Sequence, residues 1–112
     1  MPNTTPVHDQ IRLELRRGTL TLAVLSALRQ EQYGYTLRKT LADAGLAIEE
    51  SALYPMLRRL EDQGLLVSKW RTEGGREKRF YRLSAAGIAL LPRILDDWHG
   101  LTRTLDGLFA GD

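Results

Sequence analysis

The sequence predicts a mainly α-helical fold with one small antiparallel hairpin. Apolar residues recur at the three- and four-residue spacing of amphipathic helices through most of the chain. Two short stretches, 66–71 and 78–83, instead have the alternation and composition of strands, and a Gly-Gly pair lies between them. The length of 112 residues, with 43% hydrophobic and 27% charged residues, is typical of one soluble globular domain with a single core.

The first part of the chain predicts an arm and three helices. Residues 1–8 contain prolines and threonines without an apolar period, which indicates a flexible arm. The apolar residues that follow predict a short helix at about 9–16 and a second helix over 19–30, with Thr19 as its N-cap. A third helix is expected at about 35–44, where apolar residues again recur at helical spacing.

The best-defined element is a helix from about Glu50 to Gln63. Leu53, Leu57 and Leu60 are spaced by four and three residues, so they form one apolar stripe that packs on the core. The opposite face consists of polar, charged and aromatic side chains, which are left to meet solvent or a partner.

A hairpin and a last helix complete the predicted order. The two strands enclose a glycine-rich loop at 72–76, and Ser84 caps a helix that runs toward Phe109. A lone hairpin is marginal in water and has to rest on helices. Three helices followed by a two-stranded hairpin is the order of winged helix-turn-helix domains. We therefore expect such a DNA-binding domain over 9–83 and a C-terminal dimerisation helix over 84–112.

The positive charge of the chain is concentrated in its middle. Residues 58–83 contain eight basic and four acidic side chains, whereas residues 1–57 are neutral overall and residues 84–112 have a net charge of −2. A basic segment between neutral and acidic ones favours a surface that meets a polyanion. The plainer interpretation is a charged face that meets only solvent.

The helix at 50–63 and the hairpin loop provide the predicted DNA-binding residues. In helix-turn-helix proteins the N-terminal part of this helix meets base edges in the major groove. Tyrosine and serine reach phosphates or bases, arginine clamps phosphate or guanine, and glycine lets the backbone approach a phosphate. The alternative is an ordinary exposed helix face and a plain charged turn. The residues concerned are Ser51, Tyr54, Pro55, Arg58, Arg59, Gly74, Gly75, Arg76 and Lys78.

The last helix has an apolar seam that predicts a homodimer. The seam is close to an a/d heptad pattern, and a second copy of the chain is its most economical partner. The alternative is that the helix folds back on its own core, and Pro92 is expected to bend it. Trp98 lies at the centre of the seam, either as packing or, with its two-fold copy, as a slot for a small aromatic ligand. The seam residues are Leu91, Ile94, Trp98, Leu101, Leu105 and Leu108.

The composition excludes or disfavours several other classes of site. The chain has no cysteine and only two histidines, which excludes disulfides and thiol catalysis and disfavours a transition-metal site. No nucleophile is accompanied by a base, so we expect no enzyme activity, no catalytic residue and no cofactor. No apolar run approaches the roughly 20 residues of a membrane helix, and the start of the chain lacks the features of a signal peptide. A cytoplasmic protein without a membrane partner is therefore expected.

Residues 15–98 resemble the PadR family of bacterial transcriptional regulators. The resemblance rests on several motifs in a fixed order, which together are more specific than any one of them. The short C-terminus, one helix long, is similar to the compact PadR subfamily. The motifs are LRRGTL at 15–20, YGY at 33–35, LYPMLRRLE at 53–61, GLL at 64–66, Trp70, GGR at 74–76 and FYRLSAAG at 80–87.

The resemblance implies a homodimeric winged-helix repressor. The helix at 50–63 would enter the major groove, the hairpin tip would touch the DNA backbone or minor groove, and the C-terminal helix would make the dimer. Trp98 occupies the place where compact members stack an aromatic ligand. The expected partners are double-stranded DNA with a pseudo-palindromic operator, a second copy of the chain and a small aromatic effector. The competing hypothesis is a winged-helix protein-interaction module that binds no nucleic acid.

Overall fold

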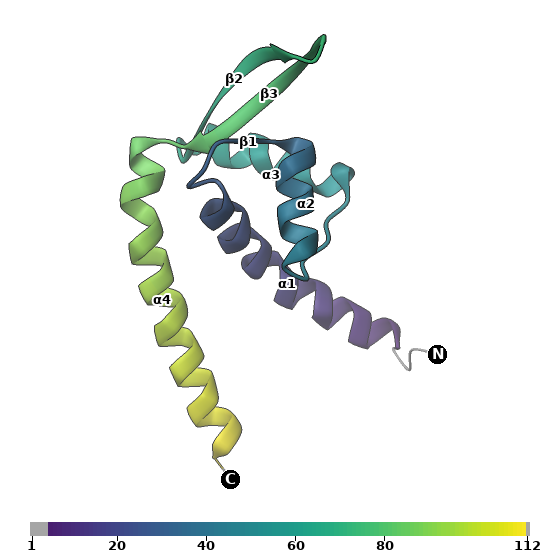
Figure 1. The fold of residues 1–112 in the computed structure, drawn as a ribbon. Helices are drawn as coiled ribbons and strands as arrows, with labels where there is room; N and C mark the ends of the chain where they lie inside the picture. Colours follow the sequence, from purple (N-terminus) through teal and green to yellow (C-terminus); the bar gives the residue numbers. More distant parts are fainter. Residues whose placement is uncertain (1–4, 112) are drawn as a thin grey trace.

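The computed structural model describes residues 5–111, and this part of the chain forms four helices and a small antiparallel sheet (Figure 1). The mainly helical winged fold expected from the sequence is confirmed. The sheet projects at one end of the molecule, and the C-terminal half of α4 extends toward the other (Figure 1). In chain order the elements are α1 (Pro6–Ala27), β1 (Gln32–Tyr33), α2 (Gly34–Asp43), α3 (Glu50–Asp62), β2 (Leu66–Glu73), β3 (Arg76–Leu83) and α4 (Ala85–Ala110).

The start of α1 corrects the predicted arm. The helix begins at Pro6, so residues 6–8 are helical, while residues 1–4 lie outside the described part of the chain. Thr5 is the N-cap, and its hydroxyl accepts a hydrogen bond of 3.0 Å from the main-chain N–H of His8. A proline in the first turn lacks an N–H that would have no helical partner there, and a threonine cap satisfies another. These two residues extend the helix into the predicted arm.

The two helices predicted at 9–16 and 19–30 are one continuous helix. Thr19 is not a cap, because its hydroxyl donates to the carbonyl of Leu15 at 3.1 Å within the same helix. Gly18 lies inside the helix at a cost of about 1 kcal/mol relative to alanine. The C-terminal part of α1 packs into the core, and tertiary packing of this kind outweighs the propensity of a single glycine.

One hydrophobic core joins α1, α2, α3 and the base of the sheet. The stripe of Leu53, Leu57 and Leu60 on α3 is buried, as the spacing predicts. It packs with leucines of α1 and α2, and Leu66 and Leu83 extend the core to the sheet. Burying a leucine side chain contributes about 1.5–3 kcal/mol, so this stripe fixes which face of α3 remains outside.

The sheet has three strands, in the order β1–β3–β2, rather than the two that the sequence predicts. The short strand β1 pairs with β3 through Gln32 opposite Tyr81 and Tyr33 opposite Phe80. The β2–β3 hairpin closes at Gly74 and Gly75, whose φ angles of 58° and 77° suit a two-residue turn. The predicted loop at 72–76 is therefore shorter, because the strands continue up to these two glycines.

The helix α4 begins at the predicted cap. The hydroxyl of Ser84 accepts a hydrogen bond of 3.0 Å from the N–H of Gly87. The first part of α4 packs on the core through Leu91, and the helix continues past Pro92 to its end at Ala110. Among residues 5–111, no helix combines the length and the hydropathy that crossing a membrane requires.

Candidate nucleic-acid interface

The outward face of α3 carries four of the nine residues predicted to bind DNA. Because the leucine stripe points inward, Ser51, Tyr54, Pro55 and Arg58 are exposed on the other side of the helix. Arg59 is exposed too, but its guanidinium points toward α1, with its Nη2 3.5 Å from the hydroxyl oxygen of Thr21. Arg59 is therefore directed away from the other predicted residues on α3.

The ring of Tyr54 lies against the start of α2. A Cβ atom added to Gly34 would clash with the Tyr54 hydroxyl and would lie 2.8 Å from the ring carbon that bears it. The absence of a side chain at Gly34 thus makes room for the tyrosine. With 38% of its surface exposed, Tyr54 is supported on one side and open to a partner on the other. The glycine of the YGY motif therefore provides space for Tyr54, a role that the sequence alone does not reveal.

We call the β2–β3 hairpin the wing. A groove of about 380 Å³ separates it from α3. Its lining is mainly aromatic and basic, with Glu61 and Glu77 as its two acidic members. Aromatic and basic side chains suit sugars, bases and phosphates. Sequence analysis did not assign the aromatic residues other than Tyr54 to the site. The alternation of the strands places Trp70 and Tyr81 on the α3-facing side, and this pattern could have revealed them. The aromatic and basic lining residues are Tyr33, Tyr54, Trp70, Tyr81, Arg58, Lys78 and Arg79.

The tip of the wing is accessible, but its two basic residues differ. Gly74, Gly75 and Arg76 are exposed. Lys78 turns back onto Tyr33, with its Nζ 4.4 Å from the ring centroid and 3.4 Å from the tyrosine hydroxyl. Lys78 therefore lines the groove, whereas Arg76 extends from the tip.

Three of the eight basic side chains counted between residues 58 and 83 are already paired within the chain. Arg71 and Lys69 both contact the carboxylate of Glu31, with N–O distances of 2.8 and 3.7 Å. Arg79 pairs with the carboxylate of Glu61 at 3.0 Å. Among residues 5–111, the other basic side chains of this segment, Arg58, Arg59, Arg76, Lys78 and Arg82, have no ion-pair partner. The charge that remains for a polyanion is accordingly on α3 and along β3, with Arg58 on the outward face of α3 and Arg76 at the wing tip.

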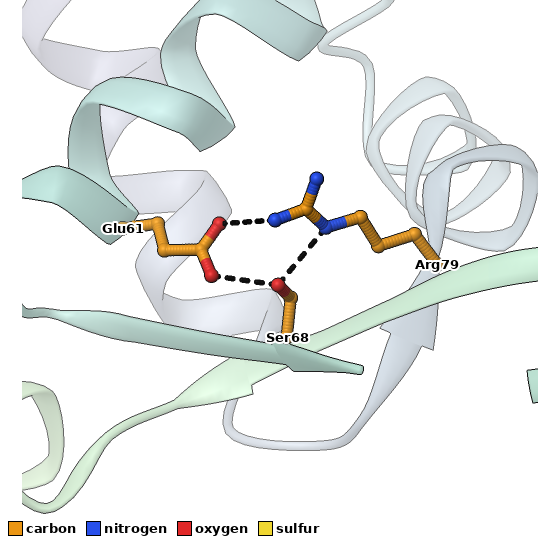
Figure 2. Close-up of polar contacts among 3 residues, drawn as sticks. All are labelled: Glu61, Ser68 and Arg79. Carbon is orange, nitrogen blue, oxygen red and sulfur yellow. Dashed lines mark hydrogen bonds and ion pairs between the residues drawn. The ribbon is translucent and has the colours of Figure 1, made fainter. Parts of the chain in front are cut away.

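Three side chains connect α3 to the wing in a closed ring of hydrogen bonds, which we call the Glu61 network (Figure 2). One carboxylate oxygen of Glu61 accepts from Nη2 of Arg79 at 3.0 Å, and the other accepts from the hydroxyl of Ser68 at 2.6 Å. The Ser68 oxygen in turn accepts from Nε of Arg79 at 3.0 Å. The ring of Tyr81 lies beside this network, with its centroid 5.5 Å from the guanidinium carbon of Arg79.

Burial raises the pKa of Tyr81 above its ordinary value of 10.0. The positive charge of Arg79 opposes this shift, and the negative charge of Glu61 adds to it. The phenol therefore stays protonated at neutral pH and serves the groove as a neutral aromatic surface.

The predicted dimer seam on α4 is only partly available to a partner. Leu91 is 4% exposed and belongs to the core of its own chain, so it is not part of a dimer surface. Ile94 is half-buried, whereas Trp98, at 42%, and the residues beyond it are exposed. The helix packs on its own core as far as Leu95 and leaves the seam exposed from Trp98 onward. The exposed seam residues beyond Trp98 are Leu101, Leu105 and Leu108.

A second apolar surface, which sequence analysis did not assign, lies on α1. Its N-terminal half exposes four large apolar side chains between 49% and 70%. Such a surface marks a contact site when it is contiguous, and here it lies on a helix that extends from the core (Figure 1). The residues are Val7, Ile11, Leu13 and Leu15.

No group of three metal-binding side chains is present among residues 5–111. A lone histidine is a weak metal site, because transition metals are bound by several convergent ligands.

Comparison with known proteins gives one consistent family. The model of the transcriptional regulator PadR-like family matches residues 22–93. The transcriptional regulator Rv3488 of Mycobacterium tuberculosis is 40% identical over 79 residues, which cover 70% of this chain and 74% of that protein.

Solved structures agree with this family. A PadR family transcriptional regulator from Eggerthella lenta is 43% identical, with a TM-score of 0.88 and 95% of each chain covered. A PadR-like transcription factor from Bacteroides fragilis is 26% identical, with a TM-score of 0.75 over 88% of this chain and 98% of that chain. These relatives are regulators of transcription and not enzymes. On this evidence the chain belongs to the PadR-like family of transcriptional regulators.

Proposed function

We propose that the protein is a sequence-specific DNA-binding repressor that acts as a homodimer. The observation that supports this most directly is the groove in which the outward face of α3 meets the aromatic and basic side of the wing. In the proposed complex α3 enters the major groove, and the wing tip meets the backbone or the minor groove. Repression, rather than activation, is inferred from the family resemblance. A cytoplasmic location is proposed together with this function, because a repressor has to reach an operator on the chromosome.

Tyr54 and Arg58 are the proposed base- or phosphate-contacting residues of α3. Both are exposed, they are one helical turn apart, and both line the groove. Arg58 has five donors in a fixed fork and suits a bidentate contact with guanine or phosphate. Ser51 and Pro55 lie beside them on the same face, and Arg76 provides the charge at the wing tip.

Self-association uses the exposed apolar surfaces of α4 and α1. Leucines beyond Trp98 on α4 are exposed, and a second copy related by a two-fold axis is able to cover them. Two α3 helices in such a dimer read half-sites about 34 Å apart, which requires a pseudo-palindromic operator. A Leu101→Asp variant should dimerise more weakly, so the dissociation constant of its dimer, measured by sedimentation, should be larger than that of the wild type.

A small aromatic effector is proposed to bind at Trp98. The indole is 42% exposed on α4, and its two-fold copy would face it across the dimer axis. A panel of aromatic compounds should quench tryptophan fluorescence in the wild type and not in Trp98→Ala. If no compound quenches, Trp98 serves only in packing.

The central experiment is a DNA-binding titration with a duplex taken from upstream of the protein's own coding region. Tyr54→Ala and Arg58→Ala should each lose specific binding while the protein remains dimeric. Arg103→Ala is the matched control, because this exposed arginine lies on α4 outside the seam. The logarithm of the binding constant should fall steeply with the logarithm of salt concentration. Unchanged affinity in both variants, or no retention on heparin, would instead favour a protein-interaction module.

A further inference from the structure

The hydrophobic core supports only the base of the wing. Leu66, Tyr81 and Leu83 are buried in the core, whereas every residue of β2 after Leu66 is exposed or half-buried. A two-stranded hairpin is not rigid in water without packing. Above this base the wing is held by its pairing with β1, by the contact between Phe80 and Tyr33, whose ring centroids are 5.2 Å apart, and by polar contacts.

The Glu61 network is the polar link between the wing and α3. Among residues 5–111, every side-chain hydrogen bond between α3 and the wing is made by Glu61. The second anchor of the wing, Glu31, contacts Lys69 and Arg71 and lies in the segment before β1, not on α3. Only the Glu61 network can therefore transmit the position of α3 to the wing through polar contacts.

The network lies where a small rotation has a large effect. Arg79 pairs with Trp70 in the hairpin register. Each of the two residues is four positions from the nearer glycine of the turn, Trp70 from Gly74 and Arg79 from Gly75. At about 3.3 Å per residue, the tip is roughly 13 Å beyond this point. A tilt of about 10° would then move the tip by about 2 Å, enough to break a hydrogen bond of ordinary length.

We propose that Glu61, Ser68 and Arg79 are positioning residues that set the angle of the wing to α3. At this angle Arg76 reaches DNA while α3 occupies the major groove. This inference rests on the proposed function. The three residues act through the wing and make no contact with DNA themselves. The ring of hydrogen bonds suits this role, because each member restrains the other two and the Arg79 fork has a fixed geometry (Figure 2).

The alternative role for Arg79 is a direct contact with phosphate, and the two roles predict opposite signs. If Arg79 binds DNA, Glu61 weakens binding, so Glu61→Gln should tighten it by removing a negative charge and releasing a positive one. If Glu61 positions the wing, Glu61→Gln should weaken binding. The matched control is Asp62→Asn, which removes the neighbouring carboxylate, exposed and without an ion-pair partner among residues 5–111. This control should leave operator affinity unchanged or slightly raise it.

Ser68→Ala tests the network without any change in charge. It removes the hydroxyl that donates to Glu61 and accepts from Arg79. Operator affinity should fall as in Glu61→Gln, and Ser68→Thr, which keeps a hydroxyl and suits a strand, should restore it. Thermal unfolding of each variant reports whether the fold itself has been affected.

Coupling to the wing tip separates positioning from general destabilisation. Arg76→Ala should weaken binding in the wild type and should have less effect when Glu61→Gln is already present. The difference should be about twofold or more, the lower limit expected for coupled residues. The salt dependence of Glu61→Gln should also become shallower by about one for each phosphate that the wing no longer neutralises. Strictly multiplicative effects of the two substitutions, or tighter binding by Glu61→Gln, would overturn the proposal.

A fluorescence measurement distinguishes failure of this proposal from failure of the proposed function. The chain has two tryptophans, so Trp98→Phe leaves Trp70 on the wing as the sole reporter. In this background Glu61→Gln should lower the anisotropy of Trp70 and increase its quenching by acrylamide. If the wild type binds no DNA, the proposed function fails and the positioning role falls with it, whatever Trp70 reports. If the wild type binds and Trp70 is unchanged in Glu61→Gln, only the positioning proposal is refuted.

Discussion

Gly34→Ala should weaken DNA binding although Gly34 itself is buried and makes no contact with DNA. The added Cβ would lie 2.8 Å from the ring carbon of Tyr54 that bears the hydroxyl, whereas ordinary contact begins at 3.4 Å. The tyrosine ring must therefore move by at least about 0.6 Å. Gly34 is the first residue of α2, so alanine does not disrupt the helix. Its higher helix propensity stabilises the helix by at most about 1 kcal/mol.

The expected decrease in affinity follows from the contact that Tyr54 is proposed to make. A well-placed side-chain contact with DNA contributes about 1–3 kcal/mol, so misplacing it should weaken each half-site by about 5- to 150-fold. The assay is a titration of labelled operator by fluorescence anisotropy, with thermal unfolding measured in parallel. Gly18→Ala is the matched control, because nothing lies within 4 Å of the added Cβ in the middle of α1. This control should raise stability slightly and leave affinity unchanged.

A double-mutant cycle tests whether the effect passes through the tyrosine. In a Tyr54→Ala background, Gly34→Ala should have no further effect on operator affinity. Wild-type affinity in Gly34→Ala, or an equal decrease in the presence and absence of Tyr54, would refute the reasoning.

Three further predictions concern the fold that presents this surface. Leu57→Ala should lower the free energy of unfolding by about 2–5 kcal/mol in denaturant titrations, since Leu57 is fully buried, and a decrease of less than about 1 kcal/mol would contradict the assigned core. Gly87→Ala should cost about 1–3 kcal/mol, because the new Cβ would press on the backbone carbonyl of Leu65, whereas Gly107→Ala has open space and should not. The folded pKa of Tyr81 lies above 10.0, so the free energy of unfolding should decrease as the pH rises from about 10 through that higher value. Tyr81→Phe should remove this part of the decrease, and an unchanged pH profile would show that the phenol does not contribute.

Local patterns in the sequence account for most of the secondary structure. The spacing of Leu53, Leu57 and Leu60 determines both the existence of α3 and the face that it buries. Adjacent glycines between alternating strands specify the hairpin, and Ser84, an N-cap residue type before a helical apolar pattern, gives the start of α4. These features depend on neighbours within a few positions, and helical or strand periodicity records such neighbours directly.

Where sequence periodicity predicted the wrong structure, contacts between residues distant in the chain determined the observed one. Thr19 resembles a helix cap in isolation, but packing of the second half of α1 keeps the helix continuous through it. The two-residue strand β1 is too short to have a period and exists only because β3 pairs with it. Leu91 continues an apolar seam in the sequence, yet the core of its own chain buries it.

The electrostatics of the site show the same division. The basic residues between 58 and 83 can be counted in the sequence, but the sequence does not reveal which carboxylates pair with them. Arg79 pairs with Glu61, 18 residues away, and Arg71 with Glu31 across the wing. Residue types and local spacing thus identify a basic helix and a glycine turn, whereas the fold selects which cations are neutralised and which remain for a polyanion. The physical reason is that a charge is screened or left free by whatever lies within a few ångströms in space, and chain distance carries no information about that.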